Sequence, residues 1–415
     1  MTEMEERNMK TKTTVFFALV LSFCLGLAAN AAKKQVELKP IGIRVYHFEI
    51  QGRTAPVAVW YPASQAGDKP FDYNNQAPGT AYLDAAPDKS SAPYPLIVFS
   101  HGLGGCGYQS ISYVENLVRA GYVVAAMDHK DAAMCVMEGK PKVTTGKIVL
   151  ATLKSGGNLS GMVLALFHDD LKGMDFSYRP KDISALIDRN LELNRTDTVL
   201  KGMINEKIIG ATGHSLGGYT TLALAGGDYN CVAPSSYPEE TCQKADQLVE
   251  HPKLAKKENV DIATMGDLSC CLKQLKGTET NYGDKRISAA LSLAPAVFFP
   301  KGAFKAVKMP LMIITGEGNF EVPFEPIQQV YGELSGPKYL LHVKGVDHMT
   351  ITDVAYKIVM ARLILPGYRS KFRMKKEMYE KFSQNFFDAY LKGDKAALAY
   401  ISAPHFPLVQ LQAKP

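Results

Sequence analysis

The sequence predicts an α/β domain with a mostly parallel central sheet and helices on both faces. Strand-like and helix-like segments alternate along most of the 415 residues, which is typical of this class. Several strand-like runs are apolar throughout, as expected for parallel strands buried on both faces. A serine flanked by glycines, Ser215, lies between one such run and a helix-like segment. The chain is long enough for one large domain with insertions.

The first residues have the pattern of an export signal. Positive charges precede the apolar stretch Val15–Leu27, and Ala29–Ala31 follow it as a small-residue cleavage site. The glutamates near the beginning are unusual in a signal and leave Met9 as an alternative start. A retained membrane anchor is the competing interpretation, but the apolar stretch is short for a span. We therefore predict a signal peptide over residues 1–31 and a periplasmic or secreted protein.

We predict one domain over residues 32–415. Strand-like and helix-like segments alternate from its first half onward. Residues 62–93 are rich in Gly, Pro, Asp and Ser, which indicates a loop. The elements expected around it are strands at Ile43–Phe48, Ala55–Trp60, Pro95–Phe99 and Tyr122–Met127, and a helix at Ile111–Ala120.

The second half carries two irregular stretches, which we predict as insertions at about 134–177 and 228–285. The second is polar and rich in cysteine, so it is either a cap stapled beside the active-site mouth or a plain surface excursion. The elements expected between and after them are helices at Tyr178–Leu193, Tyr219–Ala225 and Met374–Leu391, and strands at Lys207–Thr212, Ile287–Leu293, Pro310–Thr315 and Tyr339–Val343.

Cysteine usage and charge limit the function classes. An even number of cysteines beyond the leader permits disulfides in an oxidising compartment, although their pairing cannot be deduced from sequence. Metal binding is the alternative, but no C-x-x-C pair supports it. The net charge of +6 is modest, and two basic clusters are typical of solvated helix faces, so no nucleic-acid partner is expected. The cysteines are Cys106, Cys135, Cys231, Cys242, Cys270 and Cys271.

Ser215 is the candidate nucleophile. It occupies the centre of Gly213-His214-Ser215-Leu216-Gly217, directly after a strand-like run. A sharp strand-to-helix turn lifts a serine oxygen above a sheet, and glycines at the flanking positions let neighbouring backbone pass close by. The alternative is a glycine-rich turn without chemistry.

His348 is the candidate base. A hydroxyl needs a base to remove its proton before it attacks. His348 follows the last predicted strand, at the sheet edge where strand ends meet, and it comes after the serine in chain order. His214 lies within the turn itself and is expected to support it.

A second glycine-rich turn, His101 to Gly105, follows the Pro95–Phe99 strand directly. Backbone N–H groups in such a turn face a developing oxyanion, together with the amide that follows the nucleophile. We assign the amides of Leu103 and Leu216 to this oxyanion hole. A tight glycine turn is the competing interpretation.

Three motifs together carry a family resemblance. The chain resembles the platelet-activating-factor acetylhydrolase family and its bacterial relatives grouped with dienelactone hydrolases, from about Val57 to the C-terminal helices, faintly in both insertions. The resemblance implies an α/β-hydrolase fold with cap-like insertions and a serine hydrolase that needs no metal or cofactor and acts on short or oxidised acyl esters. It also implies the roles of Ser215, His348, Leu103 and Leu216 given above. The motifs are Pro95–Gly104, the Val123–Ala126 strand followed by Asp128-His129, and Gly213–Gly218.

The triad acid departs from the family pattern. Where the bacterial relatives place an aspartate, four residues before a proline, this chain has Asn319. An asparagine can orient an imidazole but cannot stabilise its positive charge, and the same replacement in a serine protease lowers kcat by about 10⁴. Glu321 is the preferred substitute, since a longer glutamate compensates for displacement along the loop. Glu317 is an alternative, and Asp347 is a poor third.

The function expected is therefore that of an exported serine ester hydrolase working through an acyl-enzyme on a small-molecule ester. A lactone or polyester hydrolase with the same machinery is the runner-up among enzymes. A catalytically weakened relative that binds a ligand is the alternative from another class, motivated by Asn319. Fold by itself does not decide between chemistries.

Overall fold

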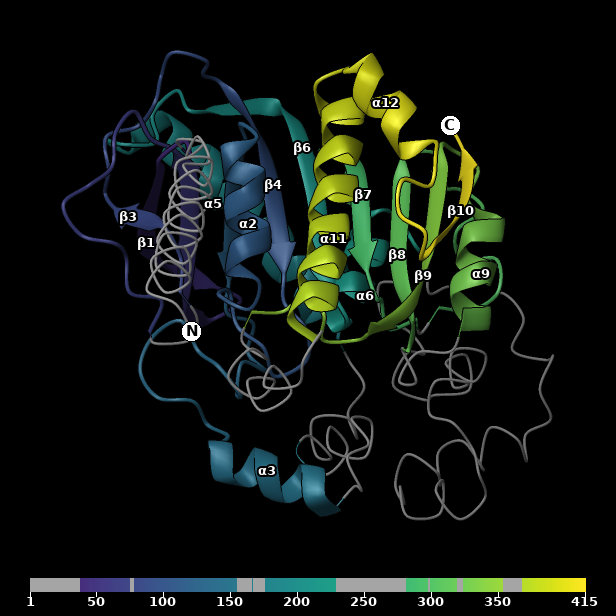
Figure 1. Ribbon diagram of the computed structural model, residues 1–415. Coiled ribbons are helices and arrows are strands. Elements are labelled where there is room, and N and C mark those ends of the chain that lie inside the picture. Colours follow the sequence, from purple (N-terminus) through teal and green to yellow (C-terminus); the bar gives the residue numbers. More distant parts are fainter. Residues whose placement is uncertain are drawn as a thin grey trace, which may run out of the picture. The chain divides into compact units, whose positions relative to one another are not determined.

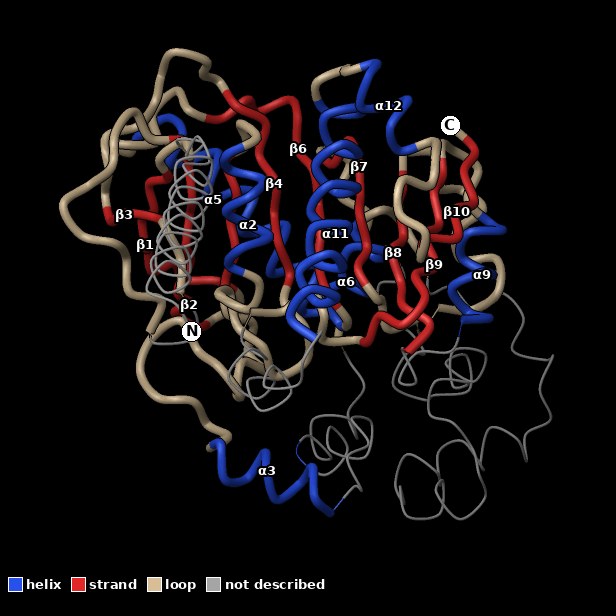
Figure 2. Tube along the Cα trace, in the orientation of Figure 1, coloured by secondary structure: helices blue, strands red, loops and turns tan. Residues whose placement is uncertain are grey.

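A computed structural model describes residues 38–74, 78–154, 166, 176–228, 281–297, 299–318, 324–353 and 368–415. Within these residues, ten strands form one sheet (Figures 1 and 2). They are β1 (Ile41–Ile50), β2 (Arg53–Pro62), β3 (Ala81–Leu83), β4 (Tyr94–Ser100), β5 (Val123–Met127), β6 (Ile204–His214), β7 (Ile287–Leu293), β8 (Leu311–Gly318), β9 (Lys338–Asp347) and β10 (Val409–Lys414).

The strand order across the sheet is β10-β9-β8-β7-β6-β4-β5-β2-β1-β3. The six strands from β9 to β5 run parallel, while β2 is antiparallel to β5. At the two ends, β1 pairs antiparallel with β2, and β10 pairs antiparallel with β9. The predicted mostly parallel α/β fold is confirmed. Because parallel strands share one direction, the loops after β4, β6 and β9 leave the sheet at the same edge.

Helices cover both faces of the sheet. Along β4, Ile97 and Phe99 pack on one side and Leu96 and Val98 on the other, as the alternation of a strand requires. The first side is covered by α2 (Ile111–Arg119), α11 (Tyr368–Leu391) and α12 (Lys395–Ile401), which lie in front of the sheet in Figure 1. The opposite side is covered by α5 (Tyr178–Thr196), α6 (Leu216–Leu224) and α9 (Phe324–Glu333).

Several elements depart from the sequence-based expectation. The prediction of an uninterrupted loop over residues 62–93 was wrong, because it contains β3, which pairs with β1. Three residues are too few to display a strand period. The sequence prediction also missed α9, α12, β10 and the helix α3 (Thr145–Lys154) in the first insertion. Among the described helices, none has the length and apolar character to cross a membrane. The predicted signal peptide and most of the second insertion lie outside the described residues.

Candidate active site

Ser215 lies at a strained turn between β6 and α6. Its backbone has φ 59° and ψ −117°, a conformation that residues other than glycine rarely adopt. Neighbouring backbone groups hold it there: the Ser215 amide donates to the Leu293 carbonyl (2.9 Å), and the Ala296 amide donates to the Ser215 carbonyl (3.1 Å). The turn is therefore fixed from the β7 side of the sheet. Strain of this kind persists where surrounding structure over-determines it, which is common at active sites.

The two glycines of the motif are required by close approach of backbone. A Cβ atom at Gly217 would lie 1.9 Å from the Ser100 carbonyl oxygen, and one at Gly213 would lie 2.3 Å from the Gly217 carbonyl oxygen. Neither distance is sterically allowed, and the obstructing atoms are backbone rather than flexible side chains. The motif thus lets the end of β4 and the start of α6 meet beneath the serine.

The glycine-rich loop after β4 packs directly against Ser215. A Cβ atom at Gly102 would lie 3.3 Å from the Ser215 Cβ. Leu103 follows Gly102 in this loop, and Leu216 is the first residue of α6, where the helix dipole favours negative charge. Both predicted oxyanion donors therefore belong to segments that border the serine.

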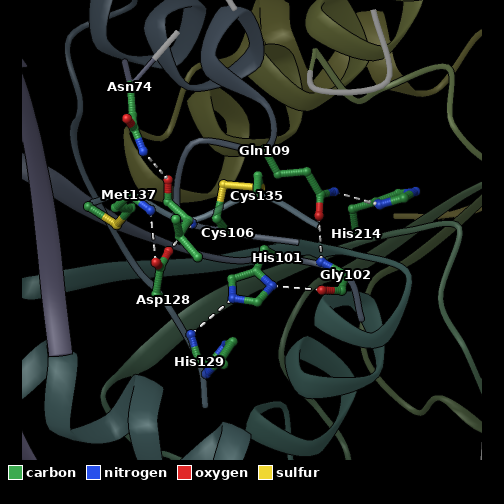
Figure 3. The surroundings of a disulfide bond; sticks show 12 residues. Asn74, His101, Gly102, Cys106, Gln109, Asp128, His129, Cys135, Met137 and His214 are labelled. Carbon is green, nitrogen blue, oxygen red and sulfur yellow. Dashed lines mark hydrogen bonds between the residues drawn. A yellow bond between two sulfur atoms is a disulfide. The ribbon is translucent and has the colours of Figure 1, made fainter. Parts of the chain in front are cut away.

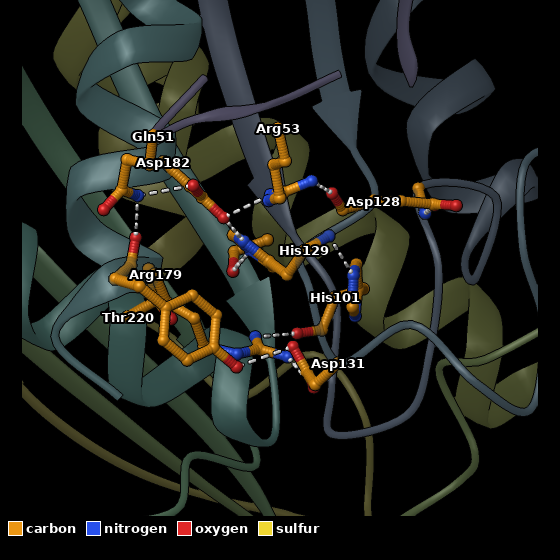
Figure 4. A network of polar contacts seen from close by, with 12 residues as sticks. Gln51, Arg53, His101, Asp128, His129, Asp131, Arg179, Asp182 and Thr220 are labelled. Atoms are coloured by element: carbon orange, nitrogen blue, oxygen red, sulfur yellow. Dashed lines mark hydrogen bonds and ion pairs between the residues drawn. The ribbon is translucent and has the colours of Figure 1, made fainter. Parts of the chain in front are cut away.

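A buried arginine binds two backbone carbonyls of the same loop. Arg179 on α5 donates to the carbonyls of His101 (2.6 Å) and Gly102 (3.2 Å) and to the carboxylate of Asp131 (2.6 Å) (Figure 4). The Gly102 carbonyl and the Leu103 N–H belong to one trans peptide, so they point in opposite directions. Holding the carbonyl against Arg179 therefore turns the Leu103 N–H away from the arginine.

Asp131 balances the charge of Arg179. Both side chains are buried, and Asp131 also accepts hydrogen bonds from the Gly104 amide (3.2 Å) and the Tyr178 hydroxyl (2.8 Å). Burial alone raises the pKa of a carboxyl group, but the Arg179 guanidinium holds the pKa of Asp131 well below its usual range. The pair is therefore ionised at neutral pH.

His101 is fixed in one neutral form. Its Nε2 accepts the backbone N–H of His129 (2.9 Å), so the ring proton is on Nδ1, which donates to the Gly102 carbonyl (2.6 Å). Burial is the main cause that lowers the pKa of His101 well below 6.5. The His129 ring bridges Ser100 (2.9 Å) and Asp182 (2.8 Å). These contacts add further anchors for the loop and for the end of β4.

A disulfide lies beside this loop. Cys106 and Cys135 are joined with their Cα atoms 5.4 Å apart (Figure 3). The carboxylate of Asp128 accepts hydrogen bonds from the amides of Gly107 and Met137, both at 2.8 Å. It therefore joins the same two segments that the disulfide joins. Burial raises the pKa of Asp128 to about 6. The expectation of disulfides is confirmed for this pair, while the other four cysteines lie outside the described residues.

His348 follows β9 and is buried against the serine turn. The rings of His348 and His214 lie 4.7 Å apart, and His214 Nε2 lies 2.7 Å from the His348 carbonyl oxygen. The structure thus brings the candidate base beside the residue that precedes Ser215. Burial, and then the neighbouring His214, lower the pKa of His348 well below 6.5.

The third member of the triad falls largely outside the structural description. Glu321 and Asn319 lie outside the described residues. Glu317 is exposed at the end of β8, and its carboxylate accepts the Gly345 amide at 3.3 Å. Asp347 ends β9, with its backbone in register with Gly318. The choice of acid stays a prediction.

Sequence reasoning missed the groups that hold these segments in place. Except for His129, which belongs to the Asp128-His129 motif but was given no role, they carry no motif. The available signal was weak: polar residues directly after β5, and polar residues inside the amphipathic pattern of α5. No cluster of three or more His, Cys, Asp or Glu side chains suited to a metal ion occurs within the described ranges. The missed residues are Gln109, His129, Asp131, Arg179 and Asp182.

The overall fold of the chain is similar to that of a solved structure. A ferulic acid esterase from Streptomyces cinnamoneus superposes with a TM-score of 0.55 at 19% sequence identity, over 91% of this chain and 97% of that chain. The chain has the α/β-hydrolase fold. The predicted fold class is thereby supported over 91% of the chain.

Sequence comparison adds a narrower finding. Residues 77–146 of the chain match the family model of platelet-activating factor acetylhydrolase, isoform II. The matched segment contains β4, the glycine-rich loop and β5, but neither Ser215 nor His348. No curated protein sequence is significantly similar to the chain. The match supports the predicted resemblance and the predicted carboxylic ester hydrolase.

Proposed function

We propose that this α/β-hydrolase is an exported serine esterase that works through an acyl-enzyme. His348 takes the proton of Ser215 as the serine oxygen attacks the ester carbonyl. The amides of Leu103 and Leu216 bind the oxyanion of the tetrahedral intermediate. The alcohol leaves with the proton from His348, and water then releases the acid by the same steps. Glu321 orients and stabilises the imidazolium.

One observation carries the proposal: a strained serine lies against a glycine-rich loop whose His101 and Gly102 carbonyls are held by Arg179. Ser215 has a positive φ, and the Gly102 position lies within van der Waals contact of its Cβ. Arg179 and His101 both bind the Gly102 carbonyl. A loop held in this way presents its next amide at fixed orientation, which is the requirement for electrostatic stabilisation without reorganisation.

The proposed substrate is a carboxylic ester with a short acyl group. The acetylhydrolase family model supports it, and the structural neighbour is itself named as an esterase. A lactone or polyester would use the same groups. Export is supported by the Cys106–Cys135 disulfide, because such bonds persist in oxidising compartments. The signal peptide over residues 1–31 and the domain over 32–415, with insertions at about 134–177 and 228–285, are part of the same proposal.

A fluorophosphonate probe tests the mechanism directly. We expect the folded protein to be labelled on the peptide that contains Ser215, and p-nitrophenyl esters of increasing acyl length to define the acyl preference. Absence of labelling in properly folded protein would instead favour the weakened, ligand-binding relative. Hydrolysis of lactones or polyesters in place of simple esters would favour the runner-up.

In the pH profile of kcat/KM, the loss of activity on the acid side should occur at lower pH than for an ordinary histidine base. His348 acts as base in its neutral form, and its lowered pKa keeps it neutral to lower pH. Activity should therefore persist as pH falls through 6.5, the ordinary histidine value, and decline only below it. Initial rates with a p-nitrophenyl ester, read at a pH-independent wavelength, give the profile. A midpoint at or above 6.5 contradicts the assignment of His348 as this base.

The acid is tested by three matched variants. We expect Glu321→Gln to lower kcat by about 10⁴-fold, as loss of the acid does in a serine protease, because the imidazolium loses its counter-charge. Glu317→Gln and Asn319→Ala should retain most of the activity. Retention of full activity by Glu321→Gln would make our preferred acid wrong, and the variant that does lose activity would identify the group in use.

A further inference from the structure

Gln109 connects three segments of the candidate site. Its Oε1 accepts the Gly102 N–H at 2.8 Å, and its Nε2 lies 2.8 Å from His214 Nδ1 (Figure 3). His214 Nε2 lies 2.7 Å from the His348 carbonyl oxygen. The backbone carbonyl of Gln109 also accepts the Asp353 amide at 2.8 Å. One side chain and its histidine partner thus bridge the glycine-rich loop, the serine turn and the loop that carries His348.

The donor and acceptor of each hydrogen bond from Gly102 through Gln109 and His214 to His348 can be assigned. A backbone N–H can only donate, so Gln109 turns Oε1 toward Gly102 and its NH₂ group toward His214. His214 Nδ1 therefore accepts, and the ring proton is on Nε2, which donates to the His348 carbonyl. This series of hydrogen bonds requires a neutral His214 in this one tautomer.

We propose that Gln109, acting through His214, is a positioning residue that sets the His348 loop and the oxyanion loop at fixed distances from Ser215. It also occupies the Gly102 N–H, which leaves the next amide, that of Leu103, as the oxyanion donor of the loop. This inference rests on the proposed esterase. Gln109 and His214 are buried, with 5% and 2% exposure, so water does not replace these bonds without rearrangement.

The decisive variant is Gln109→Glu, which keeps the shape and removes the donor. A carboxylate facing the acceptor Nδ1 of His214 cannot bind it unless a proton is taken up between them. We expect kcat about 10²-fold below wild type near pH 9 with KM little changed, since displacement by about 1 Å has that effect on rate. The deficit should shrink at lower pH, where a proton can be taken up between the new carboxylate and the imidazole. A side chain that only fills space would give the wild-type profile.

The charged and titratable groups around Gln109 bear on this profile. Asp353 binds Ser112 and Lys376 through its carboxylate, and Arg179 and His101 contact the Gln109-bound loop at the Gly102 carbonyl, not at Gln109 itself. The new carboxylate of Gln109→Glu would therefore face His214 directly, with His348 on the far side of that ring. A matched control is Gln412→Glu on the exposed part of β10, which should leave the profile at wild type.

A second measurement does not depend on activity. Imidazole ¹⁵N shifts of histidine-labelled protein, with His214→Asn to assign the signal, should report Nε2 protonated and Nδ1 unprotonated in the wild type. The opposite tautomer overturns the chain of bonds whatever the enzyme does. If the wild type has the expected tautomer but Gln109→Glu has the wild-type kinetic profile, only the positioning role is overturned. If the wild type shows neither fluorophosphonate labelling nor ester hydrolysis, the proposed esterase function itself is contradicted.

Discussion

Ser215→Ala should lower kcat for ester hydrolysis by about 10⁵- to 10⁶-fold and abolish fluorophosphonate labelling. The loss of a serine nucleophile has an effect of this size in a serine protease, where only the oxyanion hole and substrate binding then act. At about 1.4 kcal/mol per decade, this corresponds to roughly 7 to 8 kcal/mol of barrier. Purified variant and wild type are compared with one p-nitrophenyl ester at saturating concentration.

Two controls separate chemistry from folding in this experiment. Ser64→Ala, at an exposed serine, should hydrolyse the ester at the wild-type rate. Ser215→Gly should be as inactive as Ser215→Ala but more stable by about 1 kcal/mol, because glycine adopts a positive φ without strain. Substantial activity in either Ser215 variant would exclude this serine as the nucleophile.

Asp131→Asn should be the most destabilising of the polar substitutions considered. It leaves the buried Arg179 charge without its counter-ion, and breaking a buried ion pair from one side costs about 3–5 kcal/mol of unfolding free energy. Denaturant unfolding monitored by circular dichroism gives the difference from wild type. Activity should fall as well, because Arg179 holds the carbonyls of His101 and Gly102.

The pH dependence of this difference has a definite sign. The folded-state pKa of Asp131 is depressed, so its stabilising contribution is present above the unfolded value of about 3.9 and is lost as pH falls through the folded-state pKa. Wild type and Asp131→Asn should therefore differ fully at neutral pH and converge only in strong acid. As a control, Glu192→Gln breaks the exposed pair with Arg189 and should change stability by less than about 1 kcal/mol. Equal effects of the two substitutions would contradict the argument.

Local patterns were enough to predict the elements that border the candidate site. The apolar run that became β4 is buried throughout, and those of β6 and β7 are buried over most of their length. The glycines around Ser215 serve the close backbone contacts that the motif predicts. The insertion boundaries and the acid are weaker predictions, because irregular polar stretches carry no period. β3 and β10 were missed for a related reason: short edge strands are defined mainly by the strand they pair with.

The sequence by itself determined the fold class, the serine turn and the histidine that follows the last parallel strand. These depend on backbone preferences and on burial patterns that are local to each segment. Only the tertiary structure decided which polar side chains support them. Arg179 reaches the carbonyls of His101 and Gly102 because α5 covers the sheet below β4, and Gln109 meets His214 because β4 and β6 are neighbours although β5 separates them in sequence. Such contacts join distant residues through strand order, which no local pattern encodes.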